Sequence, residues 1–246
     1  MKLQHTLLTI TFDRGRISML FDLHVHTAEG SPCGKLSARD TVNVYKEKGF
    51  DGIVITDHVS RYYMEYIHKL SFDDYCKYNY EAYNIAKDEG DKVGLNVLYG
   101  CELKLDRTGH SDYLMYGVKN EFLRENQDIM TWSLEKLKEE CDKNGILIYQ
   151  AHPFRTNAMV VEPHLLFGVE VANGSHCNVG DKRNTVAKLW AELFSLHRIA
   201  GSDCHTKDGA GRCGVNFMSE IHDMSDLLKA LREDKYYLFE QAVTNR

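Results

Sequence analysis

The chain has 246 residues, of which 43% are hydrophobic and 27% charged, and its formal net charge is −6 at pH 7. That length suits one large domain with a proper core, and the acidic balance argues against a general electrostatic grip on nucleic acid or on an anionic membrane surface. The sequence also lacks an apolar run of membrane-spanning length, a signal peptide and any C-x-x-C pair among its seven cysteines, so we expect reduced thiols and a cytoplasmic location.

Segments typical of strands alternate with segments typical of helices along the chain. In chain order, strands are predicted over 19–25, 52–56, 95–103, 112–118, 146–150, 168–172, 198–202 and 236–239. Helices are predicted over 37–50, 71–90, 131–145, 183–197 and 224–235. The first two helices begin with the pattern Ser-x-x-Asp, which is typical of a capping box. The aromatic-rich segment 61–80 is interpreted as helix-packing residues or, alternatively, as a lid.

Repeated alternation of strand and helix predicts an α/β fold with a mainly parallel sheet. About seven such units favour a closed or nearly closed barrel, since barrels commonly run to about 250 residues as one unit. An open doubly wound sheet is the alternative, although no G-x-G-x-x-G or P-loop follows the first strand. We expect a single barrel domain over 19–246 and an N-terminal extension of unclear role over 1–18.

Side chains that can bind metals or move protons gather where the predicted strands end. They are His24, His26, Asp57, His58, Glu102, His110, Asp112, His152, Glu170, Asn173, Asp203 and His205. One H-x-H pair is expected by chance in a chain with 12 histidines, and a lone histidine after a buried strand is more often structural than a ligand. The coincidence over seven strands carries the argument, because all strand ends of a barrel open on the face that holds the active site.

The mixture of imidazoles and carboxylates indicates the kind of metal. Neutral imidazoles beside carboxylates suit Zn²⁺, Mn²⁺ or Fe, and not Ca²⁺ or an all-oxygen Mg²⁺ site. The candidates outnumber the three or four ligands that one catalytic zinc takes. We therefore expect two or three divalent metals, with a carboxylate such as Glu102 bridging between them.

Five motifs together resemble a known family. "DLHVHT", "ITDH", "GCE", "AHP" and "GSDCH" occur in this order at strand ends. They resemble the polymerase-and-histidinol-phosphatase (PHP) family of metal-dependent phosphoesterases, and the resemblance extends from Met19 to about Val215. It implies a distorted seven-stranded (βα) barrel, TIM-like, with a site for three Zn, Mn or Fe ions at the C-terminal ends of the strands.

The resemblance also implies how the ligands are shared between the first two metals. His24 and His26 would bind the first metal, with Glu102 and Asp203 completing it. Glu102 would bridge to the second metal, which His152 also binds.

The same resemblance assigns His58 and His205 to the third metal and gives Asp57 the task of orienting an imidazole. The family often places an Asp or His in the loop after the first motif as a further ligand. Here that loop reads "AEGSPCG" and offers only Glu29 or Cys33. An ordinary loop thiol is favoured over a ligand role for Cys33.

Five further residues have assigned roles. Asp112 is favoured as a metal ligand, with His110 as a reserve ligand or a substrate contact. Arg155 would clamp a phosphate oxygen, unless it is a surface cation. His176 would protonate the leaving group or bind substrate, against the alternative of a solvated loop histidine, and Asn173 would contact the substrate.

The predicted function is the hydrolysis of phosphate monoesters by a small-molecule phosphatase with chemistry like that of histidinol phosphatase. A hydroxide that bridges two metals would attack phosphorus in line. The substrate would be a small phosphorylated metabolite or a nucleotide, without strong nucleic-acid binding or a membrane partner. The alternatives are a phosphodiesterase or nuclease acting on nucleotides or nucleic-acid ends, and a metal-dependent amide or lactone hydrolase of the amidohydrolase type.

Overall fold

The computed structural model describes residues 18–178 and 180–241. The predicted N-terminal extension over 1–18 therefore lies, except for its last residue, outside the described residues. Among the helices of the described part, none combines the length and apolarity that a membrane crossing needs.

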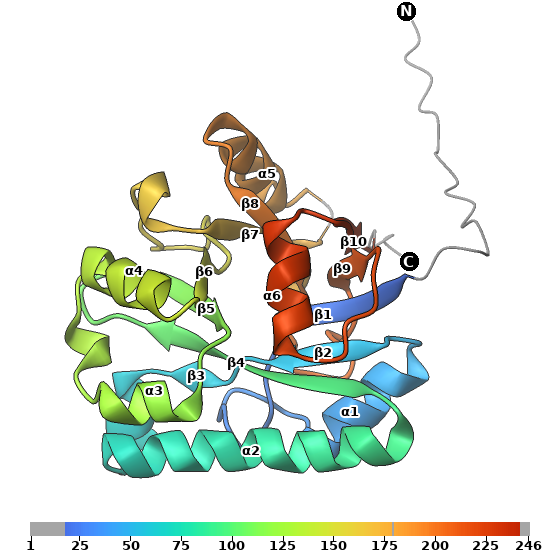
Figure 1. Cartoon of the computed structure of the whole chain (residues 1–246), viewed down its shortest axis with the longest axis horizontal. Coiled ribbons are helices and arrows are strands. Elements are labelled where there is room, and N and C mark those ends of the chain that lie inside the picture. Colours follow the sequence, from blue (N-terminus) through green and yellow to red (C-terminus); the bar gives the residue numbers. More distant parts are fainter. Residues whose placement is uncertain (1–17, 179, 242–246) are drawn as a thin grey trace, which may run out of the picture.

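The described strands form one ten-stranded sheet (Figure 1), in the order β10-β9-β1-β2-β4-β5-β6-β7-β8, with β3 paired to β4. Their bounds are β1 Met19–Val25, β2 Gly52–Ile55, β3 His58–Val59, β4 Asn96–Lys104, β5 Asp112–Tyr116, β6 Leu147–Gln150, β7 Gly168–Asn173, β8 His197–Gly201, β9 Cys213–Phe217 and β10 Tyr236–Glu240. The described sheet has more strands than the seven that the family resemblance implies, and two more than the eight segments predicted from sequence, because β3 has two residues and β9 has no preceding helix to mark it.

The sheet is nearly closed, as a barrel requires. The chain that leaves β8 returns to β1, where Val25 and Cys204 form a parallel bridge. The Cys204 N–H donates to the His24 carbonyl over 3.2 Å, and the His26 N–H donates back to Cys204 over 3.2 Å. These bonds bring the first and the last predicted ligand motifs side by side.

Strand directions are more mixed than the predicted parallel sheet. The pairs β1–β2, β2–β4, β3–β4, β6–β7 and β7–β8 are parallel, whereas β5 is antiparallel to both β4 and β6, and β9 to both β1 and β10. Because β5 runs against β4, the start of β5 lies beside the end of β4. This reversal brings Asp112, the first residue of β5, to the same mouth as the carboxyl ends of the parallel strands.

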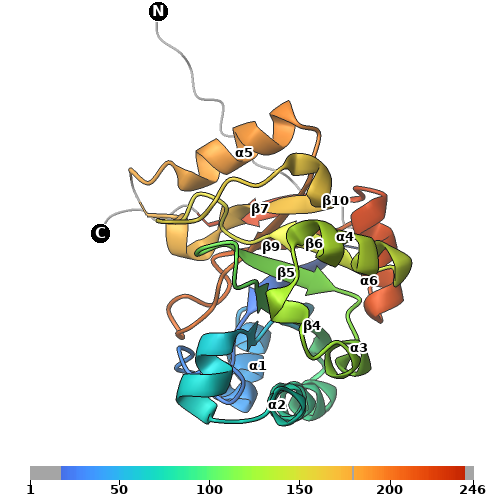
Figure 2. The same cartoon turned by 90° about the vertical axis from the view of Figure 1, so that its left-hand side faces the viewer.

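Six α-helices surround the sheet in the described residues (Figures 1 and 2). Their bounds are α1 Ala38–Glu47, α2 Phe72–Val93, α3 Asn120–Glu125, α4 Leu134–Lys143, α5 Arg183–Leu193 and α6 Met224–Arg232. Figure 2 shows α1 and α2 on one side of the sheet and α5 on the opposite side. The other helical segments are the π-helix η1 Tyr62–His68 and the three-residue 3-10 helices η2 Ile129–Thr131, η3 Pro163–Leu165 and η4 Gly174–His176.

Serine caps mark the starts of α1, α2 and α4. The hydroxyl of Ser37 accepts a hydrogen bond from the Asp40 N–H over 3.1 Å, and that of Ser71 from the Asp74 N–H over 3.2 Å. Both predicted serine caps are thus confirmed, but the Asp40 and Asp74 carboxylates accept the serine hydroxyls over 2.7 Å and not the serine backbone N–H groups of a full capping box. The helix predicted over 131–145 begins later, at Leu134, because Ser133 caps it and the preceding residues form η2.

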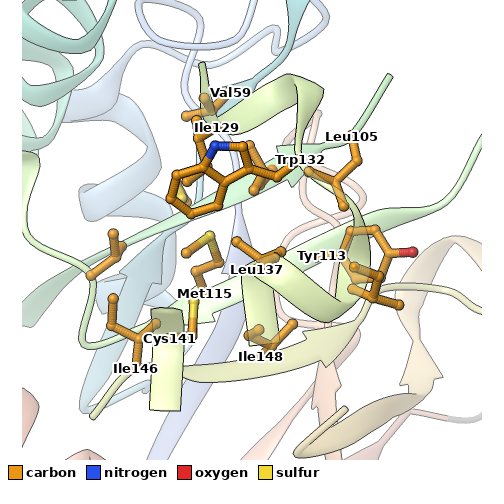
Figure 3. Packing of buried hydrophobic residues seen from close by; sticks show 14 of the residues in the cluster. Val59, Leu105, Tyr113, Met115, Ile129, Trp132, Leu137, Cys141, Ile146 and Ile148 are labelled. Atoms are coloured by element: carbon orange, nitrogen blue, oxygen red, sulfur yellow. The ribbon is translucent and has the colours of Figure 1, made fainter. Parts of the chain in front are cut away.

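One large apolar cluster fixes α4 against β5 and β6. Figure 3 shows Leu137 and Cys141 of α4 together with Met115 of β5 and Ile148 of β6, and Trp132 in the same cluster. Leu137 is fully buried, and such burial stabilises the fold by about 1.5–3 kcal/mol per side chain. The apolar faces of β5 and β6, strands near the polar mouth, are therefore packed against α4.

Candidate metal centre

Seven of the eight predicted metal ligands lie together at the mouth of the barrel. They form three overlapping groups in which one ligand atom from each member lies within 4.8 Å of the others. The groups are His24, His26 and Asp203; His24, Glu102 and His152; and His26, His58 and His205. The eighth predicted ligand, Asp112, borders the second group, since its Oδ2 lies 4.0 Å from Nε2 of His152.

Glu102 of β4 is the central acid of the site. Its Oε2 lies 3.4 Å from Nε2 of His24, 3.3 Å from Nε2 of His26 and 3.0 Å from Nδ1 of His58. Its Oε1 lies 3.0 Å from Nε2 of His152. Burial raises the pKa of Glu102, but the neighbouring imidazoles of His24, His58 and His152 lower it by more. The pKa of Glu102 therefore lies well below its usual value. The carboxylate is therefore anionic and faces two groups of imidazoles at once.

Glu170 of β7 orients two of these histidines. Its Oε1 lies 2.9 Å from Nδ1 of His24, which leaves Nε2 of that ring for a metal. Its Oε2 accepts the backbone N–H of His152 over 2.9 Å. The sequence placed Glu170 at a strand end without giving it a role. The sequence did contain a signal for a functional role: Glu170 is a carboxylate inside the otherwise apolar segment "GVEVA", which forms a buried strand.

Asn173 has a different position from the substrate contact expected for it. The residue is fully buried, and its Nδ2 donates to Oε2 of Glu170 over 2.8 Å. Its Oδ1 accepts the backbone N–H of Ser175 over 3.0 Å. Both ends of the amide are thus occupied by protein groups, and the side chain supports the orienting carboxylate.

Asp57 was expected to orient an imidazole, and its contacts are different. Its carboxylate accepts the backbone N–H of Thr27 over 2.8 Å and the Thr27 hydroxyl over 2.7 Å. The imidazole of His26 instead meets the hydroxyl of Ser31, which lies 3.2 Å from Nδ1 and also accepts the His58 N–H over 3.0 Å. Asp57 therefore holds the loop that carries the hydroxyl, and Ser31 contacts the ring.

Two of the predicted ligands have left-handed backbone conformations. His152 has φ 28° and Asp203 has φ 52°, a region that residues with a side chain rarely adopt. Such strain persists only where the surroundings over-determine it, and it is concentrated at functional sites. The bond from the His152 N–H to Glu170 is one such constraint.

The mouth opens into a cavity of about 430 Å³. Its lining includes the predicted ligands His58, Asp112 and His205 together with Cys33, and also Tyr62, Lys104, His110 and Arg155. Nζ of Lys104 lies 3.2 Å from Oδ1 of Asp112. His110 and Arg155 are exposed, so both face the space that a substrate would enter.

His176, the predicted proton donor, lies behind His152, with 6.5 Å between the ring centroids. Burial and the nearby Arg183 lower the pKa of His176 to about 4. The imidazole is therefore neutral at pH 7. It can donate one N–H bond there, but it does not carry the proton that a leaving group needs.

The donor set fits divalent transition metals. Imidazole nitrogens and carboxylate oxygens converge within coordination range, and the close imidazole contacts of Oε2 of Glu102 lack hydrogen-bond geometry, so this buried oxygen accepts no hydrogen bond from the described residues. A buried anionic oxygen without a partner is costly unless a cation completes it. The residues thus fit the metals that the motifs predict.

The sequence profile of the PHP domain matches residues 22–148, and a second profile, described as PHP-associated, matches residues 181–236. The chain belongs to the PHP domain family. The resemblance seen in the five motifs is confirmed, and membership of the PHP family supports the expected enzyme class, a metal-dependent hydrolase. Among proteins of curated function, none matches the chain significantly.

Solved structures share the fold at low sequence identity. A two-domain protein from Bacteroides vulgatus, described as containing a predicted PHP-like metal-dependent phosphoesterase, has a TM-score of 0.65 and 18% identity over 93% of this chain and 66% of that chain. PsfC from Pseudomonas syringae has a TM-score of 0.65 and 16% identity over 92% of both chains. An amidohydrolase from Chromobacterium violaceum, with bound sulfate and no metal, has a TM-score of 0.55 and 14% identity over 86% of this chain and 96% of that chain.

Proposed function

We propose that this chain hydrolyses phosphate monoesters of small molecules, using two or three divalent transition metals at the barrel mouth. The observation that carries the proposal is the position of Glu102. Its two oxygens face different imidazole groups, at 3.0 Å from His58 on one side and 3.0 Å from His152 on the other. A carboxylate in this position suits a bridge between metals beside an open cavity.

The ligand groups divide between neighbouring metal positions. His24, His26 and Asp203, together with Glu102, would hold the first metal. The second would take Glu102 and His152.

Asp112 is the better third ligand of the second position. It is 5% exposed and 4.0 Å from His152, whereas His110 is exposed at the cavity rim.

When bound, the metals would lower the pKa of a water molecule and neutralise charge on the phosphoryl group. The chain's own residues do the rest. Glu170 keeps the His24 ring in one tautomer, with Nε2 directed at the centre. Arg155, on the cavity wall, can bind two phosphate oxygens with its planar guanidinium, and Lys104 adds a second cation.

The cavity favours a small substrate over a polymer. Its volume of about 430 Å³ suits a drug-sized molecule. The net charge of −6 disfavours binding to long nucleic acid, because that affinity comes from basic side chains that neutralise phosphates and release counterions.

A nucleotide or a nucleic-acid end is the second candidate substrate, and one observation favours it. Tyr62 at the cavity rim and Tyr66 one turn further are 59% and 67% exposed. Exposed aromatic rings beside a phosphate site can stack on a base. In this case the enzyme would act on a phosphate carried by a nucleoside.

The test is a hydrolysis panel with metal-loaded protein. It contains phosphate monoesters of sugars, amino alcohols and nucleosides, phosphodiesters, and amides and lactones, each assayed with Zn²⁺, Mn²⁺ and Fe²⁺. We expect turnover of monoesters and its loss in His24→Ala, with full retention in His222→Ala, whose exposed ring pairs with Glu220 far from the mouth. Preference for diesters or amides would replace the proposal, and activity retained in His24→Ala would place the catalyst elsewhere.

A further inference from the structure

Cys33 lies against the third group of ligands, although the sequence favoured an ordinary loop thiol. Its Sγ is 3.1 Å from Nε2 of His205. The thiol lines the same cavity wall as His58 and His205. Cys33 belongs to the loop between β1 and α1, and His205 follows β8, so residues 172 positions apart meet at this point.

A backbone bond ties this loop to the neighbouring segment after β8. The Lys35 N–H donates to the carbonyl of His205 over 2.7 Å, and the Gly34 N–H donates to Ser31 over 2.7 Å. A Cβ on Gly34 would lie 2.8 Å from the carbonyl oxygen of Thr27, so the turn requires a glycine there. The position of the thiol therefore follows from the fold of the loop.

The other candidate in the loop, Glu29, is already used. Its Oε2 accepts the backbone N–H of Ala38 over 2.7 Å at the start of α1. A carboxylate there satisfies an unpaired N–H of the first turn and interacts favourably with the helix dipole. Of the two acidic or soft donors that the loop offers, only Cys33 faces the histidines.

The nitrogens of His205 have separate tasks. Nδ1 lies 2.8 Å from the backbone carbonyl of Asp203, so this nitrogen carries the proton. Nε2 then has its lone pair directed toward Cys33. In a tetrahedral zinc site, sulfur and nitrogen ligands lie ~3.5 Å apart, given Zn–S ≈ 2.3 Å and Zn–N ≈ 2.0–2.1 Å. The observed 3.1 Å needs only a small outward movement.

A second observation points to a cation at this place. Oε2 of Glu102 is fully buried and lies 3.0 Å from Nδ1 of His58, but this contact lacks hydrogen-bond geometry and no described residue donates a hydrogen bond to the oxygen. Two imidazoles and a sulfur thus share one wall of the cavity, and the anionic oxygen lies against one of these imidazoles. The contact between Cys33 and His205 is therefore part of a larger group of possible metal ligands.

We propose that Cys33 binds the third metal through its thiolate, completing a His₂Cys set with His58 and His205. The inference deepens the proposed metal centre and rests on it. A soft sulfur ligand favours Zn²⁺, Fe²⁺ or Co²⁺ over Mn²⁺ and Mg²⁺ at this position. The third position is therefore chemically different from the first two, whose protein ligands are nitrogen and oxygen.

Cobalt absorption tests the ligand directly and does not depend on turnover. The full-length protein is loaded with Co²⁺, the bound metal is counted, and the near-ultraviolet thiolate-to-cobalt charge-transfer band is recorded. We expect the band in the wild type and its loss in Cys33→Ser. Cys33→Asp is expected to bind as many cobalt ions as the wild type, without the band. Cys177→Ser, which changes a half-buried thiol near Cys213, is the matched control and is expected to keep the band.

The outcomes separate the two proposals. A band that persists in Cys33→Ser, or a wild type that binds cobalt without a band, overturns the role of Cys33 and leaves the metal centre standing. A wild type that binds no cobalt overturns both. If Cys33→Ser does not fold, Cys33→Asp gives the same reading, because it removes the sulfur and keeps an anionic donor.

Discussion

The carboxylate of Glu170 lies 2.9 Å from Nδ1 of His24, and both side chains are fully buried. The pair joins the middle of β7 to the end of β1 across the mouth of the barrel. Carboxylates in this position set the tautomer of a metal-binding histidine and raise its basicity. The geometry of the metal centre therefore depends on a residue outside the predicted ligand set.

We predict that Glu170→Gln lowers metal affinity and activity about 10- to 100-fold, the usual cost of losing such a partner. The amide keeps the shape of the side chain but loses the charge that stabilises the histidine. The measurement is metal binding by titration calorimetry, beside hydrolysis rates. Glu220→Gln is the control, because Glu220 makes a similar 3.0 Å contact with His222 on the exposed surface. Equal affinities in the two variants would contradict the orienting role.

The loop that carries His26 and Ser31 needs a glycine at position 30. A Cβ at Gly30 would lie 2.1 Å from Oδ2 of Asp57, well inside contact distance. The Asp57 carboxylate would have to leave Thr27, and the loop would move with it. We predict that Gly30→Ala destabilises the fold by about 1–3 kcal/mol, the usual cost of overpacking, and weakens metal binding.

Chemical denaturation and metal titration of Gly30→Ala would check this prediction. Gly209→Ala is the matched control, since a Cβ there would approach Oγ1 of Thr206 only to 3.3 Å and the residue lies outside the centre. Wild-type stability and metal affinity in Gly30→Ala would show that Asp57 does not hold the loop.

The gathering of the candidate ligands at one mouth could be predicted from sequence, because most of them lie at or just after the end of a strand that is recognisable by itself. His24, Glu102 and Asp203 are local features of their motifs, and a barrel brings all strand ends to one face. The serine caps of α1 and α2 were predictable for the same reason, since a cap depends on four neighbouring residues.

The unpredicted parts depend on contacts between distant segments. The role of Glu170 follows from which side chains β7 and β1 present to each other across the mouth. The place of Cys33 depends on a loop bond to the segment after β8. The antiparallel direction of β5 follows from the short connection from β4, since parallel strands need a crossover of about a dozen residues or more. The sequence carried that signal in the short gap between 103 and 112, but it carries none for the contacts of Glu170 and Cys33.

Arg155 tests the direction in which the substrate phosphate lies. We predict that Arg155→Ala raises KM about 10-fold or more for a phosphate monoester, because a bidentate charge-assisted contact is lost. Arg155→Lys should recover only part of the loss, since an ammonium is a point charge without the planar fork. Steady-state kinetics would measure both variants, with Arg107→Ala, outside the cavity lining, as control. An unchanged KM in Arg155→Ala would make the residue a surface cation.

His176 gives a pH-dependent prediction with a definite sign. Burial and Arg183 lower the pKa of His176 to about 4, from an ordinary value of 6.5. Between these values the unfolded chain takes up a proton that the folded chain does not, so the free energy of unfolding decreases as the pH falls through this range. The contribution of the neutral imidazole is fully present above pH 6.5 and is lost toward pH 4.

We therefore expect His176→Gln, which cannot titrate, to lose less stability than the wild type between pH 7 and about 4.5. The difference should be about 2 kcal/mol, the linkage value for a pKa lowered from 6.5 to about 4 over this pH range. Urea unfolding at both pH values, with a chelator present so that metal release does not contribute, measures the difference. Parallel pH profiles for the two proteins would mean that His176 takes up a proton as readily in the folded chain as in the unfolded chain, which would make its predicted role as a proton donor available again.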